Sequence, residues 1–368
     1  MNRLQLWGWM ATFFFISSAQ AQNNIQSPKE FMGYAPGEKF AFHHEVIDYF
    51  EYVAANTPEV TLIPYGKTNE GRPLVLAVVS SAENIRNLDQ IRKNNLIKIG
   101  LSNESVQGKH LPIVWLGFSI HGNEASGVNA ASPTLYALLS REKPEMQQWL
   151  DETLIIIDPC INPDGYARYV NWYRQKRAFP FNVHADTWEH DEPWPGGRYN
   201  HYLFDLNRDW AWQSQIESQQ RIKIYNQWMP HVLIDFHEMG YNSPYFFAPP
   251  AKPQHADVSS WQKEFQTIIG KNHAKHFDEN KWLYYSKDVF DLLYPSYGDT
   301  WPTFNGAMGY THEQGGGGRA GIGILMENKD TLYLKDRYLH HKTTALSSIE
   351  TVFNNREKLL SEFVKYFE

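Results

Sequence analysis

The sequence predicts a single α/β domain. Short, mainly apolar runs at residues 113–118, 154–157 and 232–236 indicate buried strands, because polar or turn-forming residues follow each of them. Helical segments separate these runs; after Glu124, for example, apolar residues recur three or four positions apart. The 368 residues, of which 42% are hydrophobic, are enough for one large core, and no internal repeat or interdomain linker divides them.

The elements before the first of these strands follow from local patterns. In order, we expect a helix at residues 42–55, strands at 60–64 and 74–79, and a polar helix at 82–99. The segment YGKTNEGRP joins the two strands and has the composition of a hairpin-like turn.

The middle of the chain is rich in turns. The strand at 154–157 is expected to be a central parallel strand, and Pro163-Asp164-Gly165 after it predicts a turn. A basic patch follows at 171–177, and residues 179–206 form a long segment rich in Pro, Gly, His and Trp. Loops of that length within a domain are usually functional or disordered.

The last third of the chain returns to regular elements. We expect helices at 215–228 and 260–277, a lid-like loop at 294–302, strands at 307–313 and 322–326 with a glycine turn at 315–318 between them, and a C-terminal amphipathic helix. The strand at 307–313 alternates in polarity, so Glu313 should face one side of it.

The N-terminus has the pattern of a secretory signal peptide. Arg3 gives a positive start, residues 4–16 are mostly apolar, and Ala19-Gln20-Ala21 resembles a cleavage site. The apolar run is too short to span a membrane comfortably, so we expect a secreted or periplasmic protein with no membrane span after cleavage. The expected organisation is a signal peptide at 1–21, a linker at 22–41 that begins near Gln22, and one folded domain at 42–368.

Charge and cysteine content limit the possible partners and bonds. The formal net charge of −7 gives no electrostatic support for nucleic-acid binding. Cys160 is the only cysteine, so no internal disulfide forms and stability comes from the core. Several aromatic residues lie in the loops rich in Pro and Gly, and packing beneath these loops is favoured over a sugar- or peptide-binding rim for Trp188, Trp194, Tyr199 and Tyr202.

A His and a Glu lie three residues apart where the strand at 113–118 leads into a helix. Imidazole and carboxylate are both zinc ligands, so His121 and Glu124 can bind one ion together. The alternative is a polar turn that caps the helix. A catalytic zinc site needs a third protein ligand and a free position for water. His237 fits, because it follows another strand far along the chain.

The order of these motifs resembles that of the zinc metallocarboxypeptidases of the carboxypeptidase A type. From about Phe42 to the C-terminus, the motifs are YGKTNEGRP, HGNE, NPDGY, WYRQKR, DLNRDW, a His after a strand and a Glu in a late strand. Each motif is weak alone, and the ordered set is specific. The resemblance implies a zinc carboxypeptidase-like catalytic domain, with a mixed, mostly parallel eight-stranded sheet between helices.

The resemblance also implies the catalytic residues. His121, Glu124 and His237 match the ligands of one Zn²⁺ ion per chain, Glu313 matches the catalytic glutamate, and Arg174 matches the arginine that polarises the scissile carbonyl. These roles agree with the chemistry. Zinc activates its bound water, a free carboxylate accepts the proton, and an arginine stabilises the oxyanion. Without the resemblance, Glu313 reads as a charge on the sheet surface and Arg174 as part of a solvated basic face.

Substrate contacts follow in the same way. Asn207 and Arg208 match the pair that binds the terminal carboxylate of a peptide substrate, which an arginine can hold through two hydrogen bonds. Their alternative role is a helix cap with a surface ion pair to Asp209. The family's mobile tyrosine is either Tyr294 or Tyr297, and we favour Tyr294 slightly.

The implied function is an exported zinc-dependent metallocarboxypeptidase that hydrolyses C-terminal peptide bonds with a glutamate as general base. Alternatives on the same fold are a peptidase of peptidoglycan stem peptides, a deacylase of N-acyl amino acids and an inactive peptide-binding module. The complete ligand set with Glu313 argues against the last of these. Side-chain specificity depends on residues 239–299, which cannot be matched to the family one by one, and the oligomeric state leaves no signal in the sequence.

Other polar residues of the long loop are not expected to form a second metal site. These are His184, His190 and His201 with Glu189 and Asp191, which are more often simply polar in a loop. His312 precedes Glu313 and should point to the opposite face of the strand.

Overall fold

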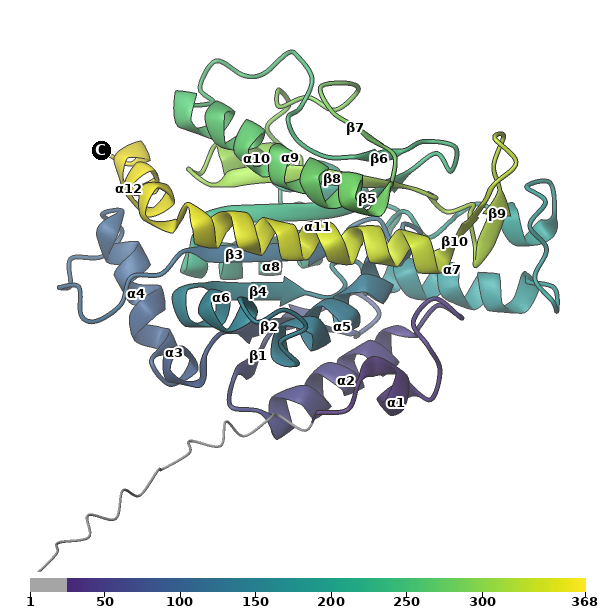
Figure 1. Ribbon diagram of the computed structural model, residues 1–368, viewed down its shortest axis with the longest axis horizontal. Helices are drawn as coiled ribbons and strands as arrows, with labels where there is room; N and C mark the ends of the chain where they lie inside the picture. Colours follow the sequence, from purple (N-terminus) through teal and green to yellow (C-terminus); the bar gives the residue numbers. More distant parts are fainter. Residues whose placement is uncertain (1–24) are drawn as a thin grey trace, which may run out of the picture.

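An eight-stranded sheet forms the centre of the computed structural model, which describes residues 25–368 (Figure 1). The strand order is β1-β2-β4-β3-β5-β8-β6-β7, and helices cover both faces of the sheet. This confirms the predicted α/β class with a mixed, mostly parallel sheet. The expected signal peptide at 1–21 lies outside the described residues.

The strands of the main sheet are β1 (Val60–Lys67), β2 (Pro73–Val79), β3 (Ile113–Phe118), β4 (Leu154–Asp158), β5 (Val232–Met239), β6 (Tyr245–Phe246), β7 (Tyr284–Tyr285) and β8 (Met308–Gly315). The pairs β3–β4, β3–β5, β5–β8 and β6–β7 are parallel. The pairs β1–β2, β2–β4 and β6–β8 are antiparallel. A separate two-stranded sheet pairs β9 (Gly323–Leu325) with β10 (Thr331–Tyr333).

The helices are α1 (Pro28–Met32), α2 (His43–Asn56), α3 (Ala82–Arg86), α4 (Leu88–Lys98), α5 (Ser126–Leu139), α6 (Met146–Glu152), α7 (Pro163–Lys176), α8 (Ile216–Trp228), α9 (Ser260–Asn280), α10 (Thr300–Thr303), α11 (Leu334–Asn354) and α12 (Arg356–Tyr366). Short 3-10 turns lie at η1 (Trp188–His190) and η2 (Leu206–Arg208).

The central strands are buried on both faces, which explains their continuous apolar sequences. In β3, Val114 and Leu116 pack with α2, α5, α7, α9 and α11, whereas Ile113 and Trp115 pack with α4 and α8 on the other face. Helix α11 crosses the front of the sheet in Figure 1, and α8 lies behind it.

The largest difference from the sequence prediction is α7. Pro163-Asp164-Gly165 was expected to form a turn, but it begins a 14-residue helix. Proline at the first helical position needs no backbone donor, and Asn162 caps the helix by accepting a hydrogen bond from the Gly165 amide at 3.0 Å. A turn-forming composition therefore marks a helix start here.

Parallel pairing brings the carboxyl ends of β3, β5 and β8 together at one edge of the sheet. In the β5–β8 register, His237 lies opposite Glu313. His237 lies within β5, whereas the sequence placed it just after the strand. Residues from three distant parts of the chain therefore converge at this edge.

Candidate metal centre and active site

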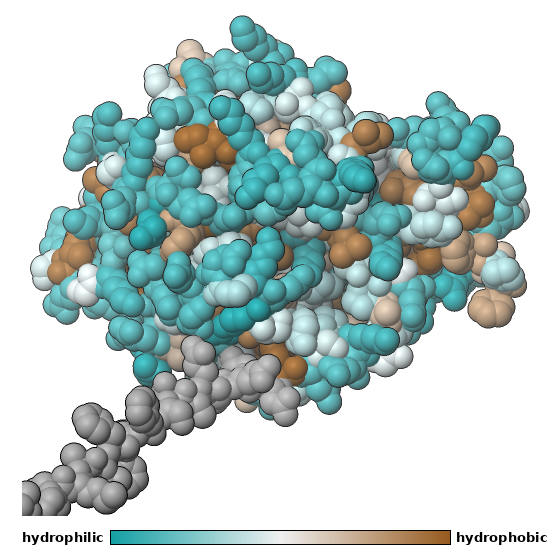
Figure 2. Space-filling view, in the orientation of Figure 1, coloured by the Kyte–Doolittle hydropathy of each residue, from teal (hydrophilic) through white to brown (hydrophobic). Residues whose placement is uncertain are grey.

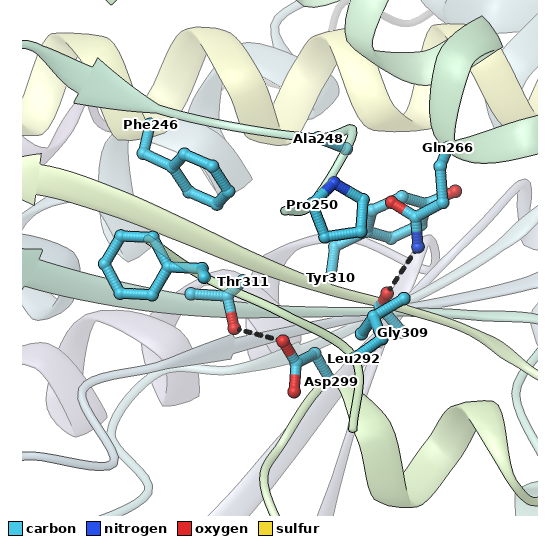
Figure 3. A pocket seen from close by; sticks show the side chains of 10 residues that line it. Phe246, Ala248, Pro250, Gln266, Leu292, Asp299, Gly309, Tyr310 and Thr311 are labelled. Atoms are coloured by element: carbon cyan, nitrogen blue, oxygen red, sulfur yellow. Dashed lines mark hydrogen bonds between the residues drawn. The ribbon is translucent and has the colours of Figure 1, made fainter. Parts of the chain in front are cut away.

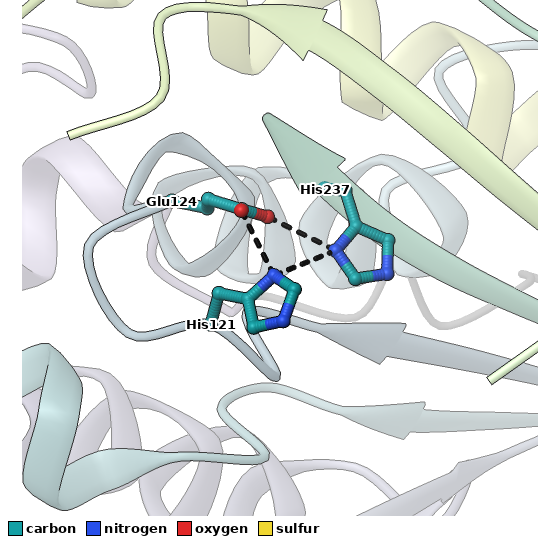
Figure 4. Close-up of side chains that lie close together, drawn as sticks. All are labelled: His121, Glu124 and His237. Carbon is teal, nitrogen blue, oxygen red and sulfur yellow. Dashed lines mark hydrogen bonds and ion pairs between the residues drawn. The ribbon is translucent and has the colours of Figure 1, made fainter. Parts of the chain in front are cut away.

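His121, Glu124 and His237 form one cluster at the carboxyl ends of β3 and β5 (Figure 4). Glu124 Oε1 lies 2.8 Å from His121 Nδ1, and Glu124 Oε2 lies 3.0 Å from His237 Nδ1. The two Nδ1 atoms are 3.3 Å apart. All three side chains are buried, and one potential ligand atom from each lies within 4.8 Å of the others.

A tight turn after β3 delivers the first two members of this cluster. Glu124 donates its amide proton to the His121 carbonyl at 3.1 Å, and the Ser119 hydroxyl donates to the Glu124 carbonyl at 2.8 Å. A Cβ atom at Gly122 would lie 2.1 Å from the Tyr166 backbone nitrogen and 2.6 Å from the Gly197 carbonyl oxygen. No side chain fits there, so the glycine allows the turn to pack against α7.

Carboxylates outside the cluster hold both imidazoles. His121 Nε2 lies 2.9 Å from Asp205 Oδ1, and His237 Nε2 lies 2.8 Å from Asp235 Oδ2. Such partners fix the ring orientation and leave Nδ1 facing the cluster. The sequence analysis missed both roles. The available signals were the position of Asp235 two residues before His237 on the same face of β5, and the start of DLNRDW at Asp205.

The cluster fits a zinc ion. Two imidazole nitrogens and one carboxylate are a common protein ligand set for catalytic zinc, and they leave a coordination position open for water. Burial raises the pKa of Glu124, but the two adjacent imidazoles outweigh this effect and hold the pKa below its ordinary value, so the carboxylate is charged. Within residues 25–368, no other trio of His, Cys, Asp and Glu converges in this way, which agrees with one zinc ion per chain.

Glu313 lies beside this cluster and does not share its hydrogen bonds. Its register partner is His237, and its side chain is 7% exposed. Oε2 of Glu313 has no hydrogen-bond partner among the described residues. Burial, aided by the charges of Glu124 and Asp235, raises the pKa of Glu313 well above its ordinary range, and the charge of His237 opposes the rise. A cation bound at the cluster would oppose this rise and favour the charged carboxylate, which is the form that accepts a proton.

Asn207 and Arg208 lie next to the cluster on η2. Asn207 Nδ2 is 3.2 Å from His237 Nε2, and its Oδ1 accepts hydrogen bonds from Gly298 N at 2.7 Å and Trp210 Nε1 at 3.1 Å. The Arg208 side chain is 48% exposed, with Nη1 3.8 Å from Asp205 Oδ2. Arg208 therefore presents a solvent-accessible cation close to Asp205, the carboxylate that contacts His121.

Both candidate tyrosines are close to Arg208, and Tyr297 is the nearer. The Arg208 guanidinium lies 4.4 Å from the centre of the Tyr297 ring. The Tyr294 ring is tilted against that of Tyr297 with ring centres 4.9 Å apart, and its hydroxyl accepts a hydrogen bond from Trp212 Nε1 at 2.9 Å. The structure thus places Tyr294 one ring further out, where its side chain is more exposed.

Arg174 is not brought to the cluster. Its guanidinium lies 3.9 Å from the centre of the Phe42 ring, at the far end of α7. The start of α7 packs against the metal-binding turn, and eleven residues of helix carry Arg174 about 16 Å along the axis. A turn and a basic patch were expected in place of α7, so the distance that this helix puts between Arg174 and the cluster was not foreseen.

Arg198 is the arginine that contacts the cluster. Its Nη1 lies 3.1 Å from Glu124 Oε1, and its Nη2 lies 3.0 Å from Asp205 Oδ2. The long segment between α7 and η2 supplies it. The sequence analysis missed this residue because it treated that segment as an undivided loop. Its place nine residues before Asn207, next to the motif DLNRDW, was the available signal.

A small cavity lies beside β8, lined by Thr311 and Asp299 among others (Figure 3). Thr311, two residues before Glu313 in β8, donates a hydrogen bond to Asp299 Oδ2 at 2.9 Å, and burial raises the pKa of Asp299 to about 6. The cavity volume is about 10 Å³, which is room for one water molecule at most. It is too small for a substrate side chain.

The aromatic residues of the long loop do not pack beneath it as expected. Trp188 is 77% exposed, Trp194 82% and Tyr202 63%, and the nearby Phe179 is 95% exposed. On the face shown in Figure 2, hydrophobic patches lie among hydrophilic residues, several of them at the end that holds β9 in Figure 1. The expectation of packing beneath the loops was therefore wrong for these side chains.

Comparison with known sequences identifies a family. The model of the family described as zinc carboxypeptidase matches residues 46–276, which include His121, Glu124, Arg198, Arg208 and His237. The match ends before Glu313. No curated protein matches this chain.

Solved structures with the same fold are metallocarboxypeptidases. A metallo-carboxypeptidase from Burkholderia cenocepacia has a TM-score of 0.56 at 13% identity, and the match covers 82% of this chain and 67% of that one. Thrombin-activatable fibrinolysis inhibitor has a TM-score of 0.58 at 15% identity, with 92% and 79% covered. Carboxypeptidase A from Helicoverpa armigera has a TM-score of 0.53 at 15% identity, with the same coverage. These similarities establish the fold.

Proposed function

The chain belongs to the zinc carboxypeptidase family of hydrolases, and from that membership we propose that it is an exported enzyme that removes the C-terminal residue from peptides. The observation that carries the proposal is the place of Arg208. The accessible guanidinium of Arg208 lies near a buried cluster that fits zinc. Asp205 links the two, at 3.8 Å from Arg208 and 2.9 Å from His121. A cation at that position suits a substrate with a free terminal carboxylate.

In the proposed mechanism, Glu313 is the general base. A zinc ion held by His121, Glu124 and His237 would supply an activated water and polarise the peptide carbonyl. Glu313 is buried, adjacent to His237 and free of hydrogen bonds at Oε2, so it can accept the water proton and return it to the leaving amine. Burial keeps bulk water away and strengthens these interactions.

Two arginines have separate roles in the proposed mechanism. Arg198 lies 3.1 Å from Glu124, so we assign it the stabilisation of the negative charge that develops on the scissile carbonyl oxygen. Arg208 holds the terminal carboxylate, with Asn207 beside it and Tyr297 against its guanidinium. Tyr294, one ring further out, contacts the substrate from the rim. Arg174 takes no part in this scheme, because it packs on Phe42.

The test is a comparison of matched peptides with free and amidated C-termini, with products identified by mass spectrometry in the presence and absence of a chelator. We expect stepwise loss of single residues from the free peptides, little cleavage of the amidated ones, and no activity with chelator. Cleavage of both peptides at one internal bond would contradict the exopeptidase proposal. Release of an acyl group from N-acyl amino acids, or cleavage of peptidoglycan stem peptides alone, would favour one of the alternatives on this fold.

We also propose export after signal cleavage. The support is the apolar run at 4–16 followed by Ala19-Gln20-Ala21. Among residues 25–368, no helix has the length and apolar character needed to cross a bilayer. N-terminal sequencing of protein recovered outside the cytoplasm should begin near Gln22, and a cytoplasmic protein that retains Met1 would contradict export.

A further inference from the structure

The segment that carries Arg198 is held by a buried acidic residue on η1. Glu189 is 2% exposed, and its Oε1 accepts hydrogen bonds from the backbone amides of Ala178 at 3.2 Å and Asn182 at 2.8 Å. Its Oε2 accepts a hydrogen bond from the Tyr173 hydroxyl at 3.3 Å. The segment between α7 and η2 is therefore fixed to α7 at its start.

The next residue, His190, joins this segment to another part of the chain. It is fully buried, with Nδ1 2.5 Å from the Arg319 carbonyl oxygen and Nε2 2.6 Å from the Asn182 carbonyl oxygen. Carbonyl oxygens only accept hydrogen bonds, whereas a neutral imidazole has a single N–H to donate. Only the doubly protonated ring can satisfy both contacts.

Arg319 also donates hydrogen bonds to the segment that carries His190. Its Nε donates to the His190 carbonyl at 3.2 Å, and its Nη2 donates to the Ala185 carbonyl at 3.0 Å. Arg319 follows the glycines at 315–318, the first of which ends β8 two residues after Glu313. The pair of His190 and Arg319 thus connects the segment that carries Arg198 to the strand that carries Glu313.

A second support lies closer to the cluster. Glu192 Oε2 accepts a hydrogen bond from Asn123 Nδ2 at 2.8 Å, and its Oε1 accepts one from the Gly197 amide at 2.5 Å. Asn123 lies in the turn between His121 and Glu124. Gly197 immediately precedes Arg198, so the hydrogen bond from Gly197 to Glu192 holds the backbone next to the Arg198 side chain.

From these contacts we propose that His190 is a positioning residue: as an imidazolium, it locks the segment between α7 and η2 to the turn after β8 and so holds Arg198 against Glu124 and Asp205. The function of the lock depends on the role proposed above for Arg198. The sequence analysis singled out Glu189 and His190 as polar loop residues, and the structure gives both a buried role.

The lock depends on both hydrogen bonds of the ring. An imidazolium donates to both carbonyls, whereas a neutral ring has one N–H and can donate to only one of them. The charged and titratable groups around it are Glu189 and Asp191 in its own segment, Glu192 further along, Tyr173 of α7 and Arg319 after β8. Release of one carbonyl should loosen the segment and lower turnover, because small displacements of a catalytic group reduce the rate.

The kinetic test compares His190→Gln with His184→Gln, a control at an exposed histidine of the same segment. We expect His190→Gln to lower kcat by about 10- to 100-fold with little change in KM, and the control to match the wild type. In an Arg198→Ala background, His190→Gln should cause no further loss of kcat. Additive losses would overturn the proposal.

A structural measurement separates this proposal from the proposed function. Hydrogen exchange at the amides of Ala178 and Asn182 reports the segment directly and needs no substrate. We expect faster exchange there in His190→Gln, with normal zinc content and an unchanged melting temperature. Unchanged exchange would contradict the lock. Faster exchange in an enzyme whose activity does not depend on Arg198 would keep the lock and contradict the role of Arg198.

Discussion

At the scale of single residues, three carboxylates of the site form ion pairs with imidazoles and a fourth does not. Glu124, Asp205 and Asp235 each contact an imidazole of the cluster, whereas Oε2 of Glu313 has no partner among the described residues. A general base needs an unoccupied oxygen within reach of the reacting water. The Asp235 oxygens also lack a hydrogen-bond partner, but Oδ2 lies 2.8 Å from His237 Nε2, so Glu313 is the carboxylate of this group that forms no ion pair with an imidazole.

Replacing Glu313 with Gln should abolish turnover and leave the zinc site intact. The amide has nearly the same shape but cannot accept a proton, so we expect kcat to fall by roughly 10²- to 10⁴-fold with little change in KM. Zinc content measured on the same sample is the control, because Glu313 does not contact the ligand atoms in the cluster. Near-normal kcat in a zinc-loaded variant would show that another group is the base.

Arg208→Ala should weaken binding in a way that depends on the substrate's C-terminus. Loss of a charge-assisted contact costs about 1.5–3 kcal/mol, so kcat/KM for free peptides should fall by that equivalent. Amidated peptides lack the carboxylate and should show almost no change. Equal losses on the two peptides would indicate that Arg208 has a structural role.

Arg198→Ala and Arg174→Ala form a matched pair that tests which arginine acts in catalysis. Arg198 contacts Glu124, so its removal should lower kcat by roughly 10²-fold or more through lost stabilisation of the oxyanion. Arg174 lies on Phe42, so its removal should leave kcat unchanged and alter only the melting temperature. The reverse pattern would restore the role that the sequence gave to Arg174.

At the scale of elements, β8 separates catalysis from packing by its two faces. Glu313 faces the cluster, and His312 points the other way, where its ring packs edge-on against His273 of α9 at 4.8 Å and against Phe236 at 5.3 Å. His341 of α11 lies on the same side. Burial holds the pKa of His273, His312 and His341 well below the ordinary histidine value, so all three are neutral in the folded protein.

This buried histidine group should make the fold sensitive to acid. In the unfolded chain each ring takes up a proton below about pH 6.5, and the folded chain resists it. The free energy of unfolding should therefore fall with decreasing pH, by about 1.4 kcal/mol per pH unit for each neutral ring. Urea unfolding at several pH values should show a shallower slope for His312→Leu than for the wild type, and the wild-type slope for the exposed His184→Leu. An unchanged slope in His312→Leu would contradict the assignment.

The elements that the sequence predicted well are those with long, regular patterns. The strands near 113–118, 154–157 and 232–236 and the helix near 260–277 lie within a few residues of their expected positions. The two-residue strands β6 and β7 gave no periodic signal, because their pairing depends on neighbours far away in sequence. The polar helix at 82–99 is split at Asn87 into α3 and α4.

At the scale of the whole molecule, the cluster that fits zinc connects two distant segments across the sheet. His121 and Glu124 follow β3, and His237 belongs to β5. The sequence predicted that these residues follow two separate strands, and the parallel pairing of β3 with β5 in the structure brings them together. The placements of Arg198 and Arg174 depended on the length of α7 and the path of the segment after it, which no local pattern encodes.

Zinc should therefore stabilise the entire domain. Binding to the folded chain alone adds about 2.7 kcal/mol to the free energy of unfolding when free zinc is 100 times its dissociation constant. Thermal unfolding with zinc and after chelation should show this as a higher melting temperature. His237→Ala should bind almost no zinc by metal analysis and show no such shift. Full zinc retention in that variant would contradict the ligand assignment.

The strand order has a consequence for how the protein is made. Phe118 of β3 pairs with Phe236 of β5, and β5 in turn pairs with β8, so the neighbours at the site are separated by long stretches of chain. Contacts of this kind form late, because each requires closure of a long loop. A chain still emerging from the ribosome cannot assemble the site until β8 has been synthesised and has entered the sheet. The proposed peptidase activity would thus be absent from any nascent chain that stops short of β8.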